Sequence, residues 1–243
     1  MSNEFYKPGE QRAERVGELF ATIARRYDLI NDIQSFGMHR LWKRRVLRLT
    51  RIQPGDRALD LCCGTGDITL ALAKAGADAT GLDFSGAMLE VAREKTGRLN
   101  SARRQKIQFI QGDAQQIPFP ENSFDVVTIG YGLRNLADLD AGLRDMWRVT
   151  KPGGRFVSLE FGKPGNALWR AMYFSYLKFM LPIFGKVFCG NSAAYAYVLE
   201  SLTHYPTQKE VSEKMAGCGW RDVRVFNLIG GVMSIHCAEK PPR

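Results

Sequence analysis

The hydrophobic and polar positions along the chain follow two alternating patterns from residue 57 onward. Short apolar runs, which predict buried strands, alternate with segments whose apolar residues recur at helical spacing. The predicted strands of this part are 57–62, 78–83, 106–111, 124–130 and 155–161. The predicted helices between them are 67–75, 85–97 and 139–149. Such alternation is typical of a parallel sheet with helices on both faces and right-handed crossovers.

The two ends of the chain have other patterns. Residues 10–26 and 39–50 each show helical spacing, and the second segment is strongly basic. Near the other end, the capping-box sequence Thr207-Gln208-Lys209-Glu210 predicts a helix that continues to about residue 217.

Two strand runs around Gly230 and Gly231 then predict a hairpin with a two-residue turn, so the last two strands should be antiparallel. Five parallel strands followed by an antiparallel hairpin resemble the class I S-adenosylmethionine-dependent methyltransferase fold. That fold is a Rossmann-like α/β fold with a seven-stranded sheet.

The first predicted strand is followed by a glycine turn, Gly64-Thr65-Gly66. This turn lies at the carboxyl edge of the sheet, where open α/β sheets bind ligands, and glycine lets the backbone approach a ligand closely. The dinucleotide-binding fingerprint needs a third glycine three residues later, where this chain has Thr69. No lysine-serine pair follows the turn either, so a phosphate-loop NTPase is not indicated.

Three acids accompany the glycine turn. Asp60 lies inside the first strand, and Asp83 ends the second strand, 17 residues after Gly66. A carboxylate at the position of Asp83 can accept two hydrogen bonds from a ribose diol. Asp113, followed by Ala114, comes after the third strand, where it would meet an adenine amino group. A site with these acids and without a phosphate grip fits S-adenosylmethionine, which has a sulfonium, an amino acid tail and no phosphate.

Four further stretches carry a more specific resemblance. They are YDLINDIQSFGMHRLWKR (27–44), GLRNLADLDAGLRDMWRVTKPGGRFVSLEFGKP (132–164), YAYVLESLTHYPTQKEV (195–211) and NLIGGVMSIHCAEK (227–240). Together they resemble, in consistent order, the ubiquinone/menaquinone biosynthesis C-methyltransferase family. Members of that family methylate a ring carbon of a prenylated quinol. The resemblance implies conversion of demethylmenaquinol to menaquinol, with the benzoquinol step of ubiquinone synthesis as the alternative.

The resemblance and the chemistry together suggest catalytic residues. A phenol has a pKa near 10, so the site must assist loss of the quinol proton at neutral pH. Arg134 would stabilise the phenolate or position a water, and Asn135 and Tyr27 would hydrogen-bond a quinol oxygen. The alternatives are a structural ion pair of Arg134 with Asp138 or Asp145, and a packing role for Tyr27. A further residue, Gly130, stands where many family members carry a serine, so a backbone contact with the donor is expected there.

The charge of the chain changes the picture of its partners. The formal net charge is +9, which favours encounter with nucleic acid, an acidic membrane or a small anion. An RNA methyltransferase is one alternative, but the sequence GYGLRN (130–135) follows the fourth strand where an Asn-Pro-Pro-Tyr type motif would stand. We therefore expect no nucleic-acid partner. A protein that only binds the donor is a third alternative.

The segment ALWRAMYFSYLKFMLPIFGKVF (167–188) is apolar and aromatic, with basic residues interspersed. It predicts a core or lid helix, or a lid that covers a prenyl tail and touches an anionic bilayer surface. Lys178 and Pro182 argue against a membrane span.

Other residues suggest little further chemistry. Five cysteines without a C-x-x-C pair and three distant histidines indicate neither a disulfide framework nor a metal site. Cys62 and Cys63 should pack as small apolar residues, and the histidines should be structural.

The chain has no signal-peptide core and no long apolar run, so we expect a cytoplasmic protein, with peripheral contact at the inner face of the membrane. The expected organisation is one methyltransferase domain over 1–243. Its parts are a helical lid (1–52), a donor-binding core (53–161), a helical substrate or lid insertion (162–206) and a C-terminal helix and hairpin (207–243).

Overall fold

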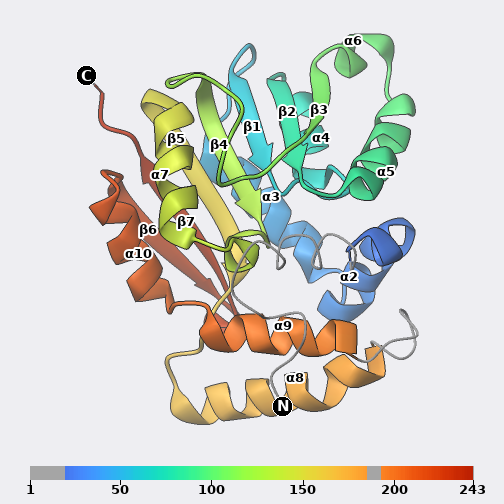
Figure 1. Cartoon of the computed structure of the whole chain (residues 1–243), viewed down its shortest axis with the longest axis vertical. Coiled ribbons are helices and arrows are strands. Elements are labelled where there is room, and N and C mark those ends of the chain that lie inside the picture. The colour runs from blue at the N-terminus through green and yellow to red at the C-terminus, as the bar shows by residue number, and fades with distance from the viewer. Residues whose placement is uncertain (1–19, 185–192, 243) are drawn as a thin grey trace.

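A seven-stranded sheet forms the centre of the structure, a computed structural model that describes residues 20–184 and 193–242. The strand order is β3-β2-β1-β4-β5-β7-β6. The strands are β1 (Arg57–Leu61), β2 (Asp78–Asp83), β3 (Ile107–Gln111), β4 (Phe124–Gly130), β5 (Thr150–Phe161), β6 (Arg221–Leu228) and β7 (Met233–Glu239). Only β7 runs against its neighbours, and the other pairs are parallel. The predicted five parallel strands and antiparallel hairpin are therefore confirmed (Figure 1).

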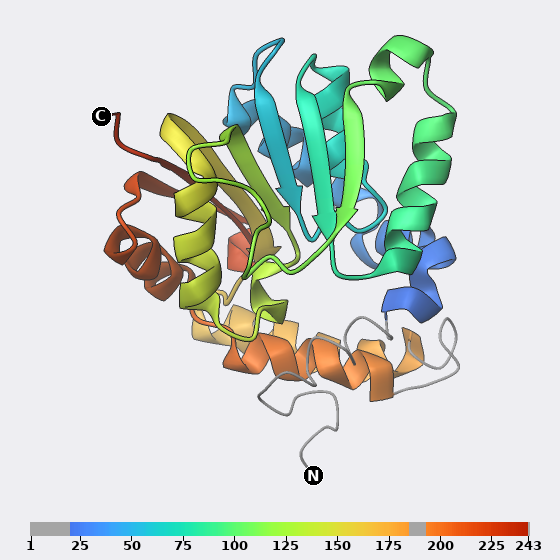
Figure 2. The same ribbon diagram turned by 45° about the horizontal axis from the view of Figure 1, so that its top comes forward.

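Helices cover both faces of the sheet (Figures 1 and 2). The helices are η2 (Ala24–Arg26), α2 (Tyr27–Ser35), α3 (Met38–Thr50), α4 (Asp67–Lys74), α5 (Gly86–Gly97), α6 (Ser101–Arg104), η3 (Leu133–Asn135), α7 (Leu139–Val149), α8 (Ala167–Phe184), α9 (Ala193–His204), α10 (Gln208–Gly217) and η5 (Ile229–Gly231). In Figure 1, α7 and α10 lie in front of the sheet, and α3 and α4 lie behind it.

The alternation of side chains along a strand explains these two layers, as β1 illustrates. Leu59 and Leu61 point to one face and join the core under α7 and α10. Ala58 points to the other face and packs with Leu72 of α4. Every one of these side chains is fully buried, so the sheet is apolar on both faces, as parallel sheets usually are.

The start of one strand and the length of the hairpin turn differ from the prediction by more than one residue. Strand β5 begins at Thr150 rather than at residue 155, because Thr150 already pairs with Phe124 before the ladder shifts register. The hairpin turn is longer than two residues. Leu228 pairs with Met233, so the four residues 229–232 connect the strands and include the short helix η5.

We call the N-terminal helices η2, α2 and α3 the lid. Of the predicted helix 10–26, the part before residue 20 lies outside the described residues; the chain is helical through Ile23, and η2 then leads directly into α2. Phe36 and Gly37 both adopt left-handed backbone conformations, with φ of 48° and 73°, and thereby turn the chain from α2 into α3. The basic helix predicted at 39–50 corresponds to α3.

Segments from both halves of the chain cover the carboxyl ends of the parallel strands. Helices α8 and α9 lie across the end toward which the strand arrows point in Figure 1. Tyr173 and Leu177 of α8 are buried with Ile23, Ile30 and Leu202, so α8 and α9 share a small core with the lid. Residues 185–188 of the segment predicted to cover a prenyl tail lie outside the described residues. No helix in the described parts of the chain is both long and apolar enough to cross a membrane.

Candidate active site

A cavity of about 100 Å³ opens at the carboxyl ends of β1, β2 and β4. Five of the residues predicted to bind the donor line it, although they come from separate segments: Gly64, Asp83, Asp113, Ala114 and Gly130. We call it the donor cavity. Parallel strands bring these segments together because their carboxyl ends share one edge of the sheet.

Asp83 is held by the backbone at the end of β2. Its carboxylate accepts hydrogen bonds from the amides of Gly64, at 2.7 Å, and Ser85, at 2.9 Å. Burial raises the pKa of Asp83 above its ordinary value. A carboxylate has about four acceptor sites, so two amide contacts leave capacity for a diol in the cavity.

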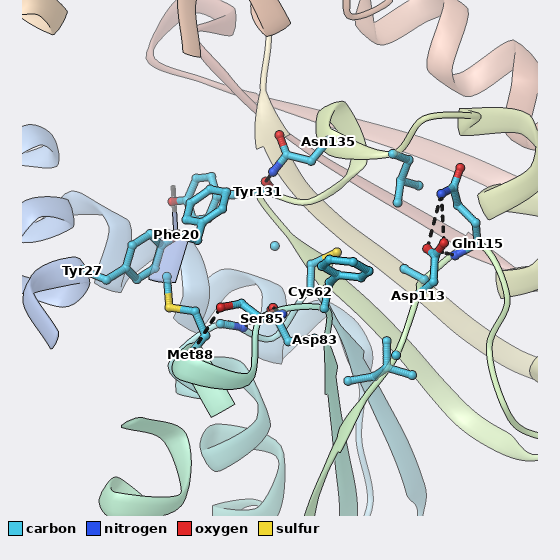
Figure 3. Close-up of a pocket in the computed structure, with 17 residues that line it drawn as sticks. Phe20, Tyr27, Cys62, Asp83, Ser85, Met88, Asp113, Gln115, Tyr131 and Asn135 are labelled. Carbon is cyan, nitrogen blue, oxygen red and sulfur yellow. Dashed lines mark hydrogen bonds between the residues drawn. The ribbon is translucent and has the colours of Figure 1, made fainter. Parts of the chain in front are cut away.

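Asp113 lies at the opposite end of the donor cavity from Phe20, Tyr27 and Tyr131 (Figure 3). Its carboxylate accepts hydrogen bonds from the backbone amide of Gln115 at 2.8 Å and from the Gln115 side chain. Seven further apolar residues of the wall were not predicted as site residues from the sequence. They are Phe20, Cys62, Leu82, Phe84, Met88, Tyr131 and Leu136. Apolar walls of this kind suit the flat faces of a nucleobase such as adenine.

The two glycines of the turn have different roles. Gly64 lines the donor cavity and has a φ of 56°. Gly66 lines neither the donor cavity nor the two other cavities described below. A Cβ atom on Gly66 would lie 3.1 Å from both Ala92 and Phe109, so this glycine permits close packing at the start of α4.

Asp60 and Thr65 lie beside the donor cavity rather than in it. Both line a smaller cavity of about 20 Å³ that shares Gly64 and Gly130 with the donor cavity. The buried Asp60 carboxylate accepts hydrogen bonds from Thr69 and Thr128, and burial raises its pKa to about 6. Asp60 thereby connects β1, β4 and the start of α4.

A second cavity, of about 380 Å³, lies between α2, α3 and α8. We call it the acceptor cavity. Aromatic and aliphatic side chains make up most of its wall, and Phe36, Trp169 and Tyr176 are both wall residues and exposed. Phe20, Tyr27 and Tyr131 line this cavity and the donor cavity alike. The two cavities therefore meet at these three rings.

Arg134 lines the acceptor cavity from η3, directly after β4. Its Nη1 lies 2.6 Å from Oε1 of Glu160, and both side chains are almost completely buried. The same nitrogen donates to the carbonyl of Tyr131 at 2.8 Å, and the guanidinium lies 4.9 Å from the centre of the Phe161 ring.

The ion-pair partners suggested from the sequence were wrong. Asp138 accepts a hydrogen bond from the Ala141 amide and caps α7, while Asp145 pairs with Arg148. Glu160 is the ion-pair partner of Arg134 instead. It lies near the carboxyl end of β5, and the pairing of β5 with β4 puts that end beside the residues that follow β4.

Tyr27 and Asn135, the other predicted catalytic residues, both lie at the donor cavity. Tyr27 lines the donor, acceptor and smaller cavities, and its ring packs edge-to-face on Phe20 at 6.0 Å. Burial raises the pKa of Tyr27, so its hydroxyl stays protonated at neutral pH. Asn135 donates a hydrogen bond to the carbonyl of Tyr131 at 3.3 Å.

An ionic cluster ties the lid to the glycine turn. Asp28 of α2 accepts a hydrogen bond from the Thr65 hydroxyl at 2.7 Å and pairs with Lys95 of α5. Lys95 also contacts Asp67 at 2.8 Å, and Asp67 pairs with Lys43 of α3 at 2.7 Å. These two lysines hold the pKa of Asp67 low, at about 2. We call this group the lid clamp.

The cysteines beside the site, Cys62 and Cys63, are not activated as thiolates. Burial raises the pKa of Cys62 and Cys63 well above the ordinary thiol value, so both stay as thiols. In the described parts of the chain, no three His, Cys, Asp or Glu side chains are grouped to hold a metal ion.

Comparisons with known proteins agree with this geometry. The profile of the ubiE/COQ5 methyltransferase family matches residues 8–240. The chain is 41% identical over 238 residues to the ubiquinone/menaquinone biosynthesis C-methyltransferase UbiE of Ectopseudomonas mendocina (strain ymp), covering 96% of this chain and 92% of the relative. It is 42% identical over 230 residues to the demethylmenaquinone methyltransferase of Staphylococcus aureus (strain JH9), covering 93% of each.

Solved structures share the fold at low sequence identity. The [4+2]-cyclase SpnF has a TM-score of 0.64 at 18% identity, over 95% of this chain and 97% of that one. Phosphoethanolamine N-methyltransferase 2 of Haemonchus contortus, solved with S-adenosyl-L-methionine, has a TM-score of 0.60 at 19% identity, over 82% of this chain and 52% of that one.

The sheet order, the cavity at the strand ends and these matches define a class I S-adenosylmethionine-dependent methyltransferase. Within this class, the chain belongs to the ubiE/COQ5 methyltransferase family, whose members act in quinone biosynthesis. The fold class, the family and the methyl donor expected from the sequence are confirmed.

Proposed function

We propose that this chain transfers a methyl group from S-adenosylmethionine to a ring carbon of demethylmenaquinol, yielding menaquinol. The observation that carries the proposal is the acceptor cavity of about 380 Å³, which is mostly apolar and meets the donor cavity at Phe20, Tyr27 and Tyr131. A prenylated quinol combines a flat ring with a long apolar tail, which such a cavity accommodates. The name of the Staphylococcus aureus relative supports the same substrate.

The donor cavity supplies the positioning. In this proposal Asp83 accepts hydrogen bonds from the ribose hydroxyls and Asp113 from the adenine amino group. The backbones of Gly64 and Gly130 allow close approach, and Asp60 and Thr65 support the turn from the smaller cavity. The bound donor supplies a methyl group on a sulfonium. The surrounding residues contribute alignment and exclusion of water.

Arg134 faces the acceptor cavity and would stabilise the quinolate that forms there. A guanidinium stays protonated and cannot take the quinol proton itself. Glu160 fixes Arg134 in place before the acceptor binds, which removes the cost of reorganising the cation. Tyr27, at the junction of the cavities, and Asn135, in the wall of the donor cavity, would hydrogen-bond a quinol oxygen.

A peripheral membrane contact completes the proposal. The apolar side chains of α8 that stand exposed are Leu168, Trp169, Met172, Tyr176, Phe179 and Ile183. Arg170 and Lys178 are exposed on the same helix. Trp169 and Tyr176 also line the acceptor cavity, so a prenyl tail leaving the cavity would emerge at this apolar surface. This arrangement corresponds to a cytoplasmic protein that contacts the inner face of the membrane.

One assay tests the substrate. Purified protein with labelled donor is offered reduced demethylmenaquinol, the demethylated benzoquinol of ubiquinone synthesis, or bulk RNA. We expect transfer to demethylmenaquinol. Preferential transfer to the benzoquinol would assign the ubiquinone step instead, and transfer to RNA alone would refute a quinol acceptor. Donor binding without transfer to any of the three would favour a protein that only binds the donor.

A further inference from the structure

His39 of α3 is a buried imidazole in the wall of the acceptor cavity. Its side chain is 3% exposed, and its Nε2 lies 2.8 Å from Oδ1 of Asp32. Asp32 in turn accepts two hydrogen bonds from Arg40, at 2.6 and 2.7 Å. Hydrogen bonds therefore connect the guanidinium of Arg40 to the carboxylate of Asp32 and this carboxylate to the imidazole of His39, which lines the acceptor cavity.

The contact with Asp32 determines which nitrogen of His39 carries the proton. Asp32 is ionised, because its contacts with Arg40 and His39 hold the pKa of this carboxyl below its ordinary range. An ionised carboxylate only accepts hydrogen bonds, so Nε2 of His39 must be the protonated nitrogen. Nδ1 then carries the lone pair. Nδ1 is buried and has no hydrogen-bond partner among the described residues.

The acceptor cavity contains other polar atoms that the described residues leave without partners. The side-chain nitrogen of Gln34 and the hydroxyl of Tyr173 are buried wall groups of this kind. Burying a polar group without a hydrogen-bond partner is unfavourable, so such groups in an apolar wall indicate a ligand with polar atoms of its own. A quinol ring offers two hydroxyl groups at opposite positions.

The quinol also needs a proton acceptor, and the candidates in this wall are few. Arg134 is a permanent cation, and burial raises the pKa of Tyr27, Tyr131 and Tyr173. Among the described residues that line the acceptor cavity, His39 is the only imidazole or carboxylate.

Resting on the function proposed above, we propose that His39, oriented by Asp32, accepts the hydroxyl proton of the quinol. The quinol O–H bond breaks, its electron pair stays on oxygen, and the proton forms a bond to Nδ1. The resulting oxygen charge makes the adjacent ring carbon electron-rich. That carbon bonds to the methyl group, while the electron pair of the broken carbon–sulfur bond stays on sulfur. The ring carbon then loses its hydrogen as a proton to water, and the electron pair of the carbon–hydrogen bond restores the aromatic ring. The oxygen regains a proton from His39, so the proton lost from the ring carbon is the one released overall.

The charges around His39 set its pH behaviour. They are Asp32 on α2, Arg40 and Lys43 on α3, Asp67 on α4, and Arg134 across the cavity. Burial lowers the pKa of His39 below its ordinary value of 6.5, more than Asp32 raises it. The imidazole is therefore neutral at pH 7, the state that a proton acceptor needs.

His39→Gln is the informative variant. A glutamine keeps an N–H donor for Asp32 but lacks the Nδ1 lone pair. His236→Gln is the matched control, because His236 is also buried, has a pKa lowered by burial, and lines none of the three cavities. Single-turnover rates with reduced demethylmenaquinol and bound donor are measured between roughly pH 5.5 and 9.

We expect His39→Gln to lower the rate at pH 7 about 100-fold, with donor affinity unchanged. Its rate should rise with pH throughout, since hydroxide replaces the lost acceptor, whereas the wild-type rate should level off above the pKa of His39. His236→Gln should keep the wild-type profile. In addition, ¹⁵N NMR of the ligand-free wild-type protein should show the proton of His39 on Nε2, and Asp32→Asn should disturb that tautomer and slow the reaction.

Other results would overturn the role of His39. A folded His39→Gln protein with a near-normal rate and an unchanged pH profile would do so, and so would a proton found on Nδ1. Should His39→Gln fail to fold, the NMR measurement and Asp32→Asn decide in its place. If wild-type protein methylates no quinol at all, the proposed function fails, and this result is separate from a variant-specific loss.

Discussion

At the scale of single residues, Asp83 and Arg134 are charged groups held in position by the protein itself. Two backbone amides orient Asp83 at the donor cavity. A buried glutamate orients Arg134 at the acceptor cavity. Groups oriented in advance bind a ligand or stabilise a charge without first reorganising. Because Asp83 and Arg134 lie at different cavities, substitutions at these two positions should have separable effects.

Asp83→Ala should weaken donor binding by about 1.5–3 kcal/mol, because hydrogen bonds to a charged acceptor are lost. Calorimetric titration with S-adenosylmethionine measures the change. Asp78→Ala, at the exposed opposite end of β2, is the control and should bind normally. Unchanged affinity in Asp83→Ala would rule out the ribose contact.

Arg134→Ala should destabilise the fold by about 3–5 kcal/mol, because it leaves Glu160 buried and uncompensated. The double variant Arg134→Gln/Glu160→Gln removes both charges, so it should recover much of that stability. Its turnover should nevertheless remain roughly 100-fold or more below wild type if Arg134 stabilises the quinolate. Denaturant unfolding and single-turnover kinetics give the two quantities. A stable double variant with normal turnover would leave Arg134 only a structural role.

At the scale of elements, the lid clamp links α2 and α3 to the glycine turn and to α5. Asp28 contacts both Thr65 and Lys95, while Lys43 and Lys95 share Asp67. The lid is therefore coupled to the glycine turn, and the order of one should depend on the other.

Asp28→Asn should lower donor affinity by about 1 kcal/mol, roughly fivefold, and increase amide hydrogen exchange in α2. The effect is modest because the Asp28 side chain is 35% exposed and partly screened by solvent. Glu94→Gln, which breaks the exposed pair of Glu94 with Arg25, is the control and should change neither quantity. Equal exchange in α2 of Asp28→Asn and wild type would show that the clamp does not order the lid.

At the scale of the whole molecule, positive charge and exposed apolar surface coincide at α8. The chain carries a formal net charge of +9, and Arg170 and Lys178 are exposed on the helix that presents Leu168 and Phe179 to solvent. The apolar side chains favour contact with a lipid surface, and the positive charge favours an anionic surface over a neutral one.

Arg170→Ala/Lys178→Ala should weaken binding to anionic vesicles by about 1 kcal/mol per residue, and salt should weaken wild-type binding through screening. Cosedimentation with vesicles that contain phosphatidylglycerol measures this. Lys74→Ala/Arg98→Ala removes the same charge from the ends of α4 and α5, away from α8, and should have a smaller effect. If wild-type protein does not bind these vesicles at low salt, α8 covers the acceptor cavity without contacting a membrane.

The sequence by itself determined the features that depend on local patterns. The bounds of β2, β4 and α7 match the prediction, because the two strands are short continuous buried runs and the apolar residues of α7 recur at helical spacing. The capping box of Thr207 and Glu210 is present at the start of α10 for a similar reason, since its contacts span one turn. The gathering of Gly64, Asp83 and Asp113 at one cavity was also predictable, because the order of strands and helices forces the carboxyl ends of the parallel strands to one edge.

The tertiary structure alone decided what depends on residues far apart in the chain. Glu160 reaches Arg134 through the pairing of β4 with β5, which no spacing in the sequence reveals. The acceptor cavity, with His39 in its wall, exists because α2 and α3 pack opposite α8, more than a hundred residues away along the chain. Helical periodicity shows that a side chain is buried, but only the packing of the surrounding elements shows whether it faces a neighbouring side chain or a cavity.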